Sequence, residues 1–190
     1  MIWHIFNSSV VSGPETLTIP ALNSLGQSLN TSVAVVLILE ERLRSKCELV
    51  QKYVESFNLK CFTIWVKGRI DLTAIDTFSS LINSHQPNIV HAHDVKASFY
   101  ALKASQRLSK ELLPKLVSTH HGTLARKGLI RIYEEFYVRW ILPRFDLTLC
   151  MSQSDYRSLI KRGLPANRVR VHYNGVDRPI VSGIDRRSTQ

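Results

Sequence analysis

The sequence predicts an α/β protein with three layers, in which helices cover both faces of a mostly parallel sheet of about seven strands. Short runs rich in β-branched residues alternate along the chain with longer segments whose apolar residues recur at helical spacing. Residues 33–39 are apolar without interruption, which is typical of a strand buried between two layers of helices. Histidine pairs follow two other apolar runs, as polar residues do where parallel strands end at an open sheet edge.

The first apolar run lies at the N-terminus, and six more follow it at intervals long enough to hold a helix. A strand, a helix and a second parallel strand form a right-handed crossover, so this order predicts one doubly wound sheet. We expect strands at residues 2–6, 33–39, 61–66, 88–91, 116–118, 147–151 and 169–172.

Six helices fill the segments between these strands. The first begins at Pro14, because proline is tolerated in a first helical turn and the carboxylate of Glu15 complements a helix N-terminus. The last is expected to begin after Ser152, a suitable N-cap, and to end near Gly163, which suits a helix C-terminus. The other helices are expected at residues 42–57, 72–84, 95–110 and 129–142.

The totals describe one globular domain of 190 residues, because a hydrophobic content of 44% is enough for a core. No apolar run approaches the ~20 residues that cross a bilayer. The N-terminus also lacks the basic start of a signal peptide, so we expect a cytoplasmic protein. Cys47, Cys61 and Cys150 lie far apart without metal-ligand spacing. We therefore expect reduced thiols and no metal site.

The formal charge of +10 is high for this length and favours contact with polyanions such as nucleic acid, an anionic membrane or phosphorylated substrates. The basic residues are dispersed, and no zinc finger or aromatic RNA-binding motif accompanies them, so we expect no nucleic-acid partner. The first loop also lacks the glycine patterns of dinucleotide-binding and P-loop enzymes, which argues against both classes.

The candidate site lies at the end of the run L-V-S-T-H-H-G-T, residues 116–123. An apolar strand that ends in this way delivers His120, His121 and the Gly122 backbone to the crevice, next to Thr123. Imidazole side chains and free backbone N–H groups at such an edge are suited to binding and proton transfer.

A second polar group follows residues 88–90, where the chain continues with His91, Ala92, His93 and Asp94. Two strands with histidines at the same end indicate one site. A single buried histidine is also often a hydrogen-bonded structural residue, and that alternative stays open for each pair. Asp94 is the nearest candidate base, although we favour a carboxylate that orients His93 or caps the following helix.

The loop after the first strand contains Gly13, directly before the helix that begins at Pro14. A glycine at this point could let a phosphate approach the free backbone N–H groups of the helix N-terminus. A simple tight turn explains the glycine equally well.

Five motifs in order resemble the N-terminal half of the family-four retaining glycosyltransferases. They read S-G-P-E at 12–15, P-N-I-V-H-A-H-D at 87–94, T-H-H-G-T at 119–123, F-D-L-T-L-C-M-S at 145–152 and R-V-R-V-H-Y-N-G-V-D at 168–177. No single motif is specific, but together they cover nearly the whole chain at family-like spacing. The resemblance implies one half of a GT-B fold, in which two Rossmann-like domains face each other and the N-terminal one mostly holds the acceptor.

The same resemblance implies roles for individual residues. His121 matches the family histidine that contacts the donor sugar near the reacting carbon, so it is the predicted catalytic residue. Gly13 stands where the family's glycine-rich loop lies near the donor phosphates, although the family often has two glycines there. The expected substrate-binding residues are Gly13, Pro14, His93, Asp94, His120, Gly122, Thr123 and Asn174.

The resemblance also implies a domain organisation. Residues 1–177 would form the acceptor-side domain, and residues 178–190 a linker or tail toward a C-terminal donor-binding domain. The whole enzyme would move a sugar from a nucleotide sugar to a glycan or lipid-linked acceptor without a cofactor, in cell-surface polysaccharide synthesis, and residues 1–190 alone would be inactive. A basic, non-catalytic module that binds membrane or nucleic acid is the alternative.

Basic and apolar residues follow the candidate site together. Arg126, Lys127 and Arg131 stand beside Leu124 and Leu129 in the sequence. This combination suits an anionic membrane that carries a lipid-linked acceptor, at the inner face of the membrane. A solvated basic loop beside a core helix explains it equally well.

Overall fold

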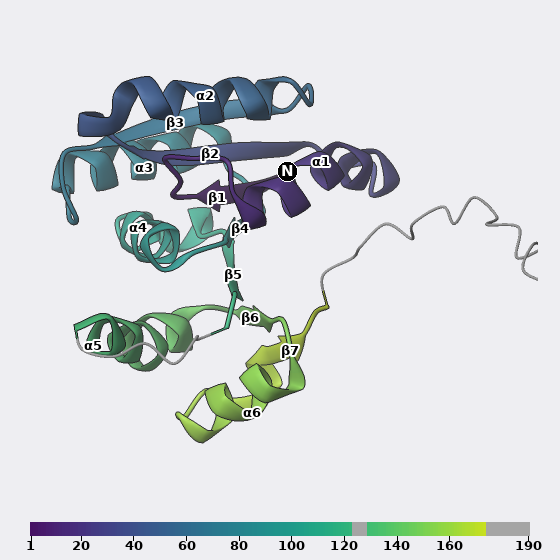
Figure 1. Ribbon diagram of the computed structural model, residues 1–190, viewed down its shortest axis with the longest axis vertical. Helices are drawn as coiled ribbons and strands as arrows, with labels where there is room; N and C mark the ends of the chain where they lie inside the picture. The colour runs from purple at the N-terminus through teal and green to yellow at the C-terminus, as the bar shows by residue number, and fades with distance from the viewer. Residues whose placement is uncertain (123–128, 174–190) are drawn as a thin grey trace, which may run out of the picture.

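The computed structural model of the chain describes residues 1–122 and 129–173 (Figure 1). Its seven strands form one sheet in the order β3-β2-β1-β4-β5-β6-β7, and every neighbouring pair is parallel. The expected three-layer, Rossmann-like α/β fold is therefore confirmed, with a sheet that is parallel throughout. The strands are β1 (Ile2–Phe6), β2 (Val33–Glu40), β3 (Lys60–Val66), β4 (Ile89–Ala92), β5 (Lys115–His120), β6 (Leu147–Cys150) and β7 (Val169–Val171).

Six α-helices connect the strands, as the alternation predicted. They are α1 (Gly13–Ser28), α2 (Arg44–Glu55), α3 (Leu72–His85), α4 (Val95–Ser105), α5 (Leu129–Phe136) and α6 (Gln153–Lys161). The short helices are the π-helix η3 (Tyr137–Ile141) and the 3-10 helices η1 (Glu41–Leu43), η2 (Lys110–Leu112), η4 (Leu142–Arg144) and η5 (Ala166–Arg168). Among the described residues, no helix combines the length and the apolar character that crossing a membrane requires.

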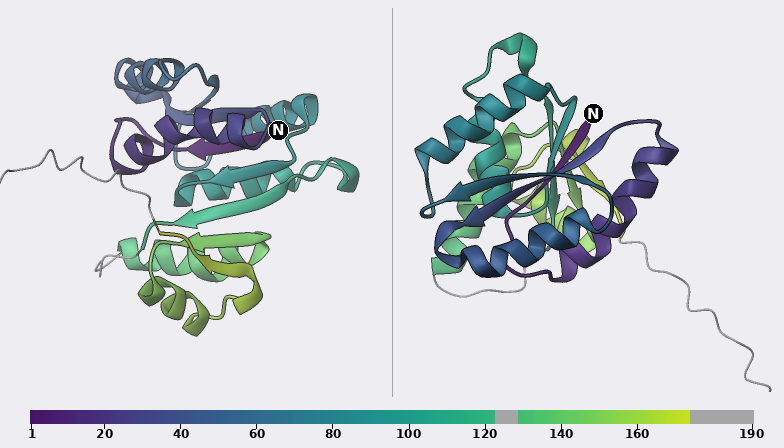
Figure 2. Two further views of the ribbon diagram at one scale, coloured as in Figure 1. Left: turned by 90° about the vertical axis from the view of Figure 1, so that its right-hand side faces the viewer. Right: turned by 90° about the horizontal axis from the view of Figure 1, so that it is seen from above.

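Helices cover both faces of the sheet (Figure 2), and a hydrophobic core lies on each face. On one face, Ile19 of α1 and Val50 of α2 pack with Leu37 of β2. The next residue of the same strand, Ile38, belongs to the other core together with Phe78 of α3. Successive side chains of a strand point to opposite faces, so a strand covered on both sides must be apolar throughout. This is why β2 contains the longest apolar run of the sequence.

The chain reverses its direction across the sheet between β1 and β4. From β1 it steps outward to β2 and β3, and it then returns to β4 on the other side of β1 and continues to β7. The loops that leave two such neighbouring strands turn to opposite faces, which opens a crevice at the carboxyl ends of the strands. The loops after β1 and β4 therefore frame the expected ligand site.

Three helices differ from the sequence-based expectation. Helix α4 ends at Ser105 instead of residue 110, because the N–H groups of Arg107 and Leu108 bond to carbonyls three residues back and not four. The helix expected at 42–57 is divided into η1 and α2, and the one expected at 129–142 into α5, η3 and η4. In η3 the N–H of Leu142 donates to the carbonyl of Tyr137, five residues earlier, which marks a π-helix.

Candidate functional site

The loops after β1 and β4 are tied together at the point where the chain reverses direction. The backbone N–H of Asn7 donates to Oδ2 of Asp94 at 2.6 Å, and the N–H of His93 donates to the carbonyl of Ile5 at 3.0 Å. Asn7 also donates from its side chain to the carbonyl of Ile38, at 2.6 Å. These bonds fix both loops at the carboxyl edge of the sheet.

Asp94 caps helix α4. Its Oδ1 accepts a hydrogen bond from the N–H of Ala97 at 2.7 Å, while Oδ2 accepts the bond from Asn7. Burial raises the pKa of Asp94 to about 6, against the backbone hydrogen bonds, which lower it. The capping role that we favoured from the sequence is confirmed.

Three histidines form a cluster at the carboxyl half of the sheet, in which His4 and His93 are buried and His91 is half-buried. Nδ1 of His4 lies 2.9 Å from Nε2 of His93, and the ring of His93 stacks on Phe6 with a centroid distance of 4.3 Å. The ring of His91 lies 4.2 Å from that of His93, and its Nε2 is 2.7 Å from Oγ1 of Thr119. The cluster lies next to the loops that follow β1 and β4.

Burial keeps these imidazoles neutral at pH 7. It lowers the pKa of His4 to about 4, and it lowers the pKa values of His91 and His93 well below 6.5, helped by the charges of neighbouring histidines. Within the described part of the chain, Nε2 of His4 and Nδ1 of His93 are buried without a hydrogen-bond partner. A neutral imidazole has one donor and one acceptor, so these rings can still bind a polar group.

The three histidines are also the residues that could hold a metal ion, since their nitrogen atoms lie within 4.8 Å of one another. A zinc ion with Zn–N bonds of about 2.0–2.1 Å needs its ligand nitrogens nearer together, with lone pairs that converge. Here the rings of His4 and His93 stack at an interplanar angle of 21°, and their facing nitrogens are already hydrogen-bonded. The side chains would have to turn before they could bind a metal. The absence of a metal site stays a prediction.

His121 lies just beyond β5, above this cluster. Its side chain is exposed, and its ring centroid is 6.4 Å from that of His93. Partial burial lowers its pKa, whereas the negative charge of Glu15 and a hydrogen bond with the His93 backbone raise it. His121 is thus the solvent-facing member of the histidine group, as a residue that contacts a substrate must be.

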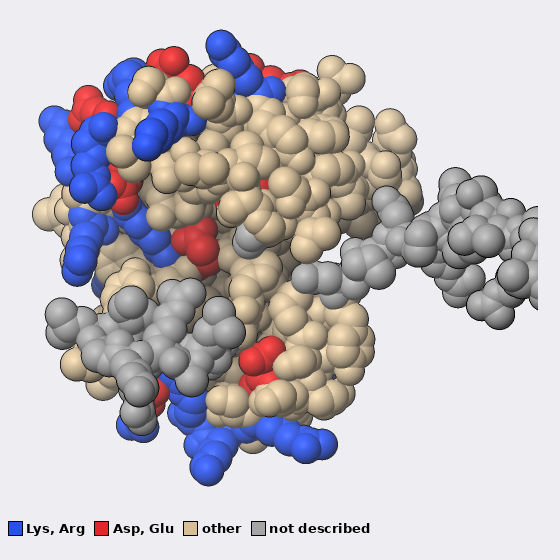
Figure 3. Space-filling model, in the orientation of Figure 1, with Lys and Arg blue, Asp and Glu red and all other residues tan. Residues whose placement is uncertain are grey.

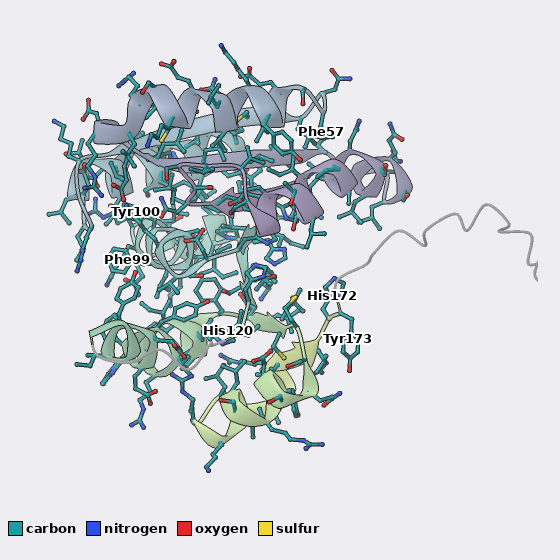
Figure 4. All side chains as sticks on the ribbon, viewed as in Figure 1. Phe57, Phe99, Tyr100, His120, His172 and Tyr173 are labelled. Carbon is teal, nitrogen blue, oxygen red and sulfur yellow. The ribbon has the colours of Figure 1, made fainter. Side chains whose placement is uncertain are left out.

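His120 lies on the opposite face of the sheet. Only 6% of the residue, which is labelled in Figure 4, is exposed. Its ring packs against Tyr137 of η3 with a centroid distance of 6.0 Å. Consecutive strand residues point to opposite faces, so His120 and His121 cannot both face the crevice. The structure brings His121 to the buried histidines and separates His120 from them.

The N-terminus of α1 completes the group of loops. Ser12 donates to Oε2 of Glu15 from its backbone N–H at 3.1 Å and from its hydroxyl at 2.9 Å. The bond from the backbone N–H places the Glu15 carboxylate as in a capping box, and only 5% of Glu15 is exposed. A Cβ added to Gly13 would meet open space. The first helical N–H groups are thus held in place beside a surface that a ligand can approach.

The model of one protein family, Glycosyltransferase Family 4, matches residues 27–178. This chain belongs to Glycosyltransferase Family 4. The matched part includes β4, β5 and the histidines that follow them, whereas β1 and the N-terminus of α1 precede it.

Solved structures with the same fold include the Anabaena protein HepE and UDP-N-acetylglucosamine 2-epimerases. The Anabaena protein HepE in complex with UDP has a TM-score of 0.68 at 18% identity, over 93% of this chain and 44% of HepE. A UDP-N-acetylglucosamine 2-epimerase has a TM-score of 0.65 at 16% identity, over 90% of this chain and 47% of its own. S. aureus MnaA, solved with UDP, has a TM-score of 0.66 at 17% identity, over 90% of this chain and 44% of MnaA.

These comparisons establish the GT-B type of fold for the family-4 chain and nothing finer, because the identities are low. The chain spans less than half the length of the proteins it matches. The comparison with curated proteins found no match.

Several expected site residues of the family-4 chain fall outside the described part. They are Thr123, Arg126, Lys127 and Asn174, together with the side chains of Pro14 and Arg131 and the expected linker 178–190. Their proposed roles stay predictions.

A shallow pocket of about 340 Å³ lies at the other edge of the sheet, where β2 begins. Asn23, Gly26, Thr31 and Asn58 are among the residues that line it. None of the histidines described above lines it, so this pocket is separate from the loops of the carboxyl edge.

Sequence reasoning missed three residues of this site. Glu15 was interpreted only as a helix-end charge, yet it is buried and its charge acts on His121. His4 interrupts an otherwise apolar strand, and Asn7 follows that strand directly. A polar side chain within or just after a buried strand was the available signal for both, since a buried polar group needs a partner.

Two glycines near the site should respond differently to replacement by alanine. Gly122 has φ +72°, and an added Cβ would lie 3.2 Å from Oδ1 of Asp155, so Gly122→Ala should destabilise the fold by roughly 1–2 kcal/mol. Gly13→Ala should leave the free energy of unfolding nearly unchanged but weaken UDP binding, if donor phosphates approach that backbone. Urea unfolding and calorimetry with UDP measure the two effects. Equal stability of Gly122→Ala and wild type would contradict the first expectation.

Proposed function

We propose that this chain is the acceptor-side half of a retaining glycosyltransferase that moves a sugar from a nucleotide sugar to a glycan or lipid-linked acceptor. Membership of Glycosyltransferase Family 4 supports glycosyl transfer. The observation that carries the proposal is the position of His121, exposed above a buried neutral histidine cluster where the loops of β1, β4 and β5 meet. Cell-surface polysaccharide synthesis at the cytoplasmic side of the membrane is the role we propose.

The residues present suit retaining transfer without a cofactor. Such a reaction must stabilise an oxocarbenium-like sugar and the charge on the departing phosphate, which hydrogen-bond donors and backbone N–H groups can do. His121 provides a donor, and the N-terminus of α1 provides backbone N–H groups. The nearby carboxylates of Asp94 and Glu15 already cap α4 and α1, so neither is free to act as the nucleophile of a double displacement.

Nucleotide-sugar donors are the ligand class we propose, with UDP as the first nucleotide to test. HepE has been solved with UDP and with UDP-glucose, and MnaA with UDP, which supports this choice. We also propose that residues 1–177 are the acceptor-side domain and that residues 178–190 lead toward a donor-binding domain. The chain's share of its structural relatives, 44% to 47%, is consistent with that division.

A second candidate function is epimerisation of a UDP-sugar. The observation that favours it is the similarity to a UDP-N-acetylglucosamine 2-epimerase at a TM-score of 0.65. The two functions give different products from one donor. Transfer links the sugar to an acceptor and releases the nucleotide, whereas epimerisation yields an isomeric nucleotide sugar without any acceptor. Product analysis with and without acceptor therefore separates them.

Residues 1–190 alone are expected to fold, to bind nucleotide sugars weakly at most, and to transfer no measurable sugar. A GT-B enzyme reacts in a cleft between two domains, and one half leaves that cleft open to water. Calorimetry with a panel of nucleotide sugars, followed by transfer assays with and without a donor-binding half, tests this expectation. Robust turnover by the chain alone would contradict the two-domain proposal. Tight duplex-DNA binding without nucleotide binding would favour a non-catalytic basic module instead.

A further inference from the structure

The outer face of α5 and η3 carries an exposed apolar stripe. Its members are Ile132, Tyr133, Phe136 and Trp140, whose exposed fractions are 66%, 51%, 49% and 56%. Residues four apart lie on the same side of a helix, so Ile132, Phe136 and Trp140 form one continuous row. A contiguous row of large apolar side chains on a surface marks an interaction site, whereas single exposed ones do not.

The inner face of the same segment already has its packing partners. Tyr137, Val138 and Ile141 are at most 4% exposed and belong to the main core. Oη of Tyr137 lies 2.8 Å from Oγ of Ser118 on β5, which anchors η3 to the sheet. The stripe is therefore held outward by a rigid support and is not a core face that has turned the wrong way.

The acidic residues of α5 are neutralised by cations within the fold. Glu134 and Glu135 form ion pairs with Arg162 of α6, at 3.1 and 2.6 Å, and Glu135 also pairs with Arg139. These contacts leave the apolar stripe without an unpaired negative charge beside it.

The C-terminal part of the described chain, which carries the stripe, is basic overall. Residues 129–173 contain eight Lys and Arg against four Asp and Glu. Figure 3 shows basic side chains gathered at the lower end of the molecule, over α6, whose exposed cations include Arg157 and Lys161. A net positive surface next to apolar side chains is complementary to a surface that is both anionic and apolar.

We propose that the apolar stripe of α5 and η3 lies in the surface of an anionic lipid bilayer, with the helix axis parallel to the membrane. Tyr133 and Trp140 suit this position, because aromatic residues with a polar group favour the boundary between headgroups and acyl chains. Phe136 and Ile132 would reach the acyl chains, and Arg139, which is 63% exposed in its side chain, would meet lipid phosphates.

This surface gives the proposed glycosyltransferase a way to reach a lipid-linked acceptor, and in that respect it rests on the proposed function. Membrane binding itself requires neither a nucleotide sugar nor His121. Vesicle binding and sugar transfer can therefore fail separately, and each failure identifies the proposal that is wrong.

The test is vesicle co-sedimentation of the 190-residue chain without nucleotide sugar. Wild type should bind vesicles of phosphatidylcholine with about one-third phosphatidylglycerol, and should bind pure phosphatidylcholine several-fold more weakly. The triple variant Ile132→Ser, Phe136→Ser, Trp140→Ser should bind the anionic vesicles more weakly than wild type, by a factor of about ten or more. A matched triple variant, Leu49→Ser, Ile70→Ser, Leu72→Ser, removes apolar side chains that are 63% to 65% exposed elsewhere and should bind like wild type.

Fluorescence gives an independent readout that does not depend on the fold of the triple variant. Of the three tryptophans, Trp3 is buried, Trp65 is half-buried beneath the guanidinium of Arg44, and Trp140 is 56% exposed. Vesicle binding should therefore shift the emission to shorter wavelength, and Trp140→Phe should lose most of that shift. Equal binding by wild type and the stripe variant would overturn the proposal. The proposal would also be overturned if the wild-type chain did not bind anionic vesicles and instead formed a dimer that the stripe variant cannot form.

Discussion

Replacing His121 by alanine is expected to lower the rate of sugar transfer by about 10²–10³-fold, because removal of one preorganised donor from a charge-stabilising site costs roughly that factor. His121 is exposed and does not pack in either core, so the variant should unfold at the same urea concentration as wild type. The measurement is kcat for transfer by the chain joined to a donor-binding half, with KM for donor and acceptor determined separately.

His85→Ala is the matched control for this variant. His85 ends α3 at the other edge of the sheet, where its ring packs against Trp3 and Phe62. Loss of that imidazole should leave kcat near the wild-type value. If His121→Ala kept its full kcat while the chain still bound UDP-sugar, the catalytic role assigned to His121 would be wrong.

Acidification is expected to destabilise the fold strongly, because the chain buries neutral histidines. Their folded-state pKa values lie below the unfolded value of 6.5, to about 4 for His4 and well below 6.5 for His91 and His93. The unfolded state therefore binds protons first, so stability is complete above about pH 6.5 and falls as the pH decreases toward 4. At about pH 5, the lowered pKa of His4 alone should reduce the free energy of unfolding by about 2 kcal/mol relative to neutral pH.

Asp94 acts in the opposite direction. Its folded pKa is raised from 3.8 to about 6, so the folded state takes up this proton first and gains stability as the pH falls through that range. Asp94 offsets part of the effect of His4, but the pKa values of His91 and His93 are also lowered well below 6.5, so a net loss of stability remains. Urea unfolding at neutral pH and at about pH 5 measures it. His4→Gln should reduce the difference between the two pH values, Asp94→Asn should enlarge it, and identical differences in all three proteins would refute the assignment.

The sequence predicted the sheet well, because strands buried on both faces leave a signal that does not depend on their partners. Expected bounds for β1, β2 and β3 agree with the structure to within one residue at each end, and Ser152 caps α6 as expected. Glycine-rich turns and caps act locally, so residue type alone identifies them.

The arrangement of the site was less accessible to sequence reasoning. That His93 and His121 would share one edge follows from parallel strands, but the inclusion of His4 depends on β1 lying beside β4. Strand order is set by packing across the whole sheet and leaves no local trace. The placement of His120 was a different error, since strand alternation could have separated it from His121. The π-turn at η3 was also unpredictable, because nothing in its residue types distinguishes it from an α-helix.

That π-turn acts as a one-residue spacer in the chain. Five residues of a π-helix turn the chain by nearly the same angle as four residues of an α-helix, so deleting one residue from η3 would restore ordinary helical winding and leave the direction of α5 almost unchanged. The apolar row would then keep facing outward, and the glutamates that pair with Arg162 would stay beside it. A deletion within α5 itself has no such slack, and because an α-helix turns by about 100° per residue it would turn the residues before the deletion away from the row.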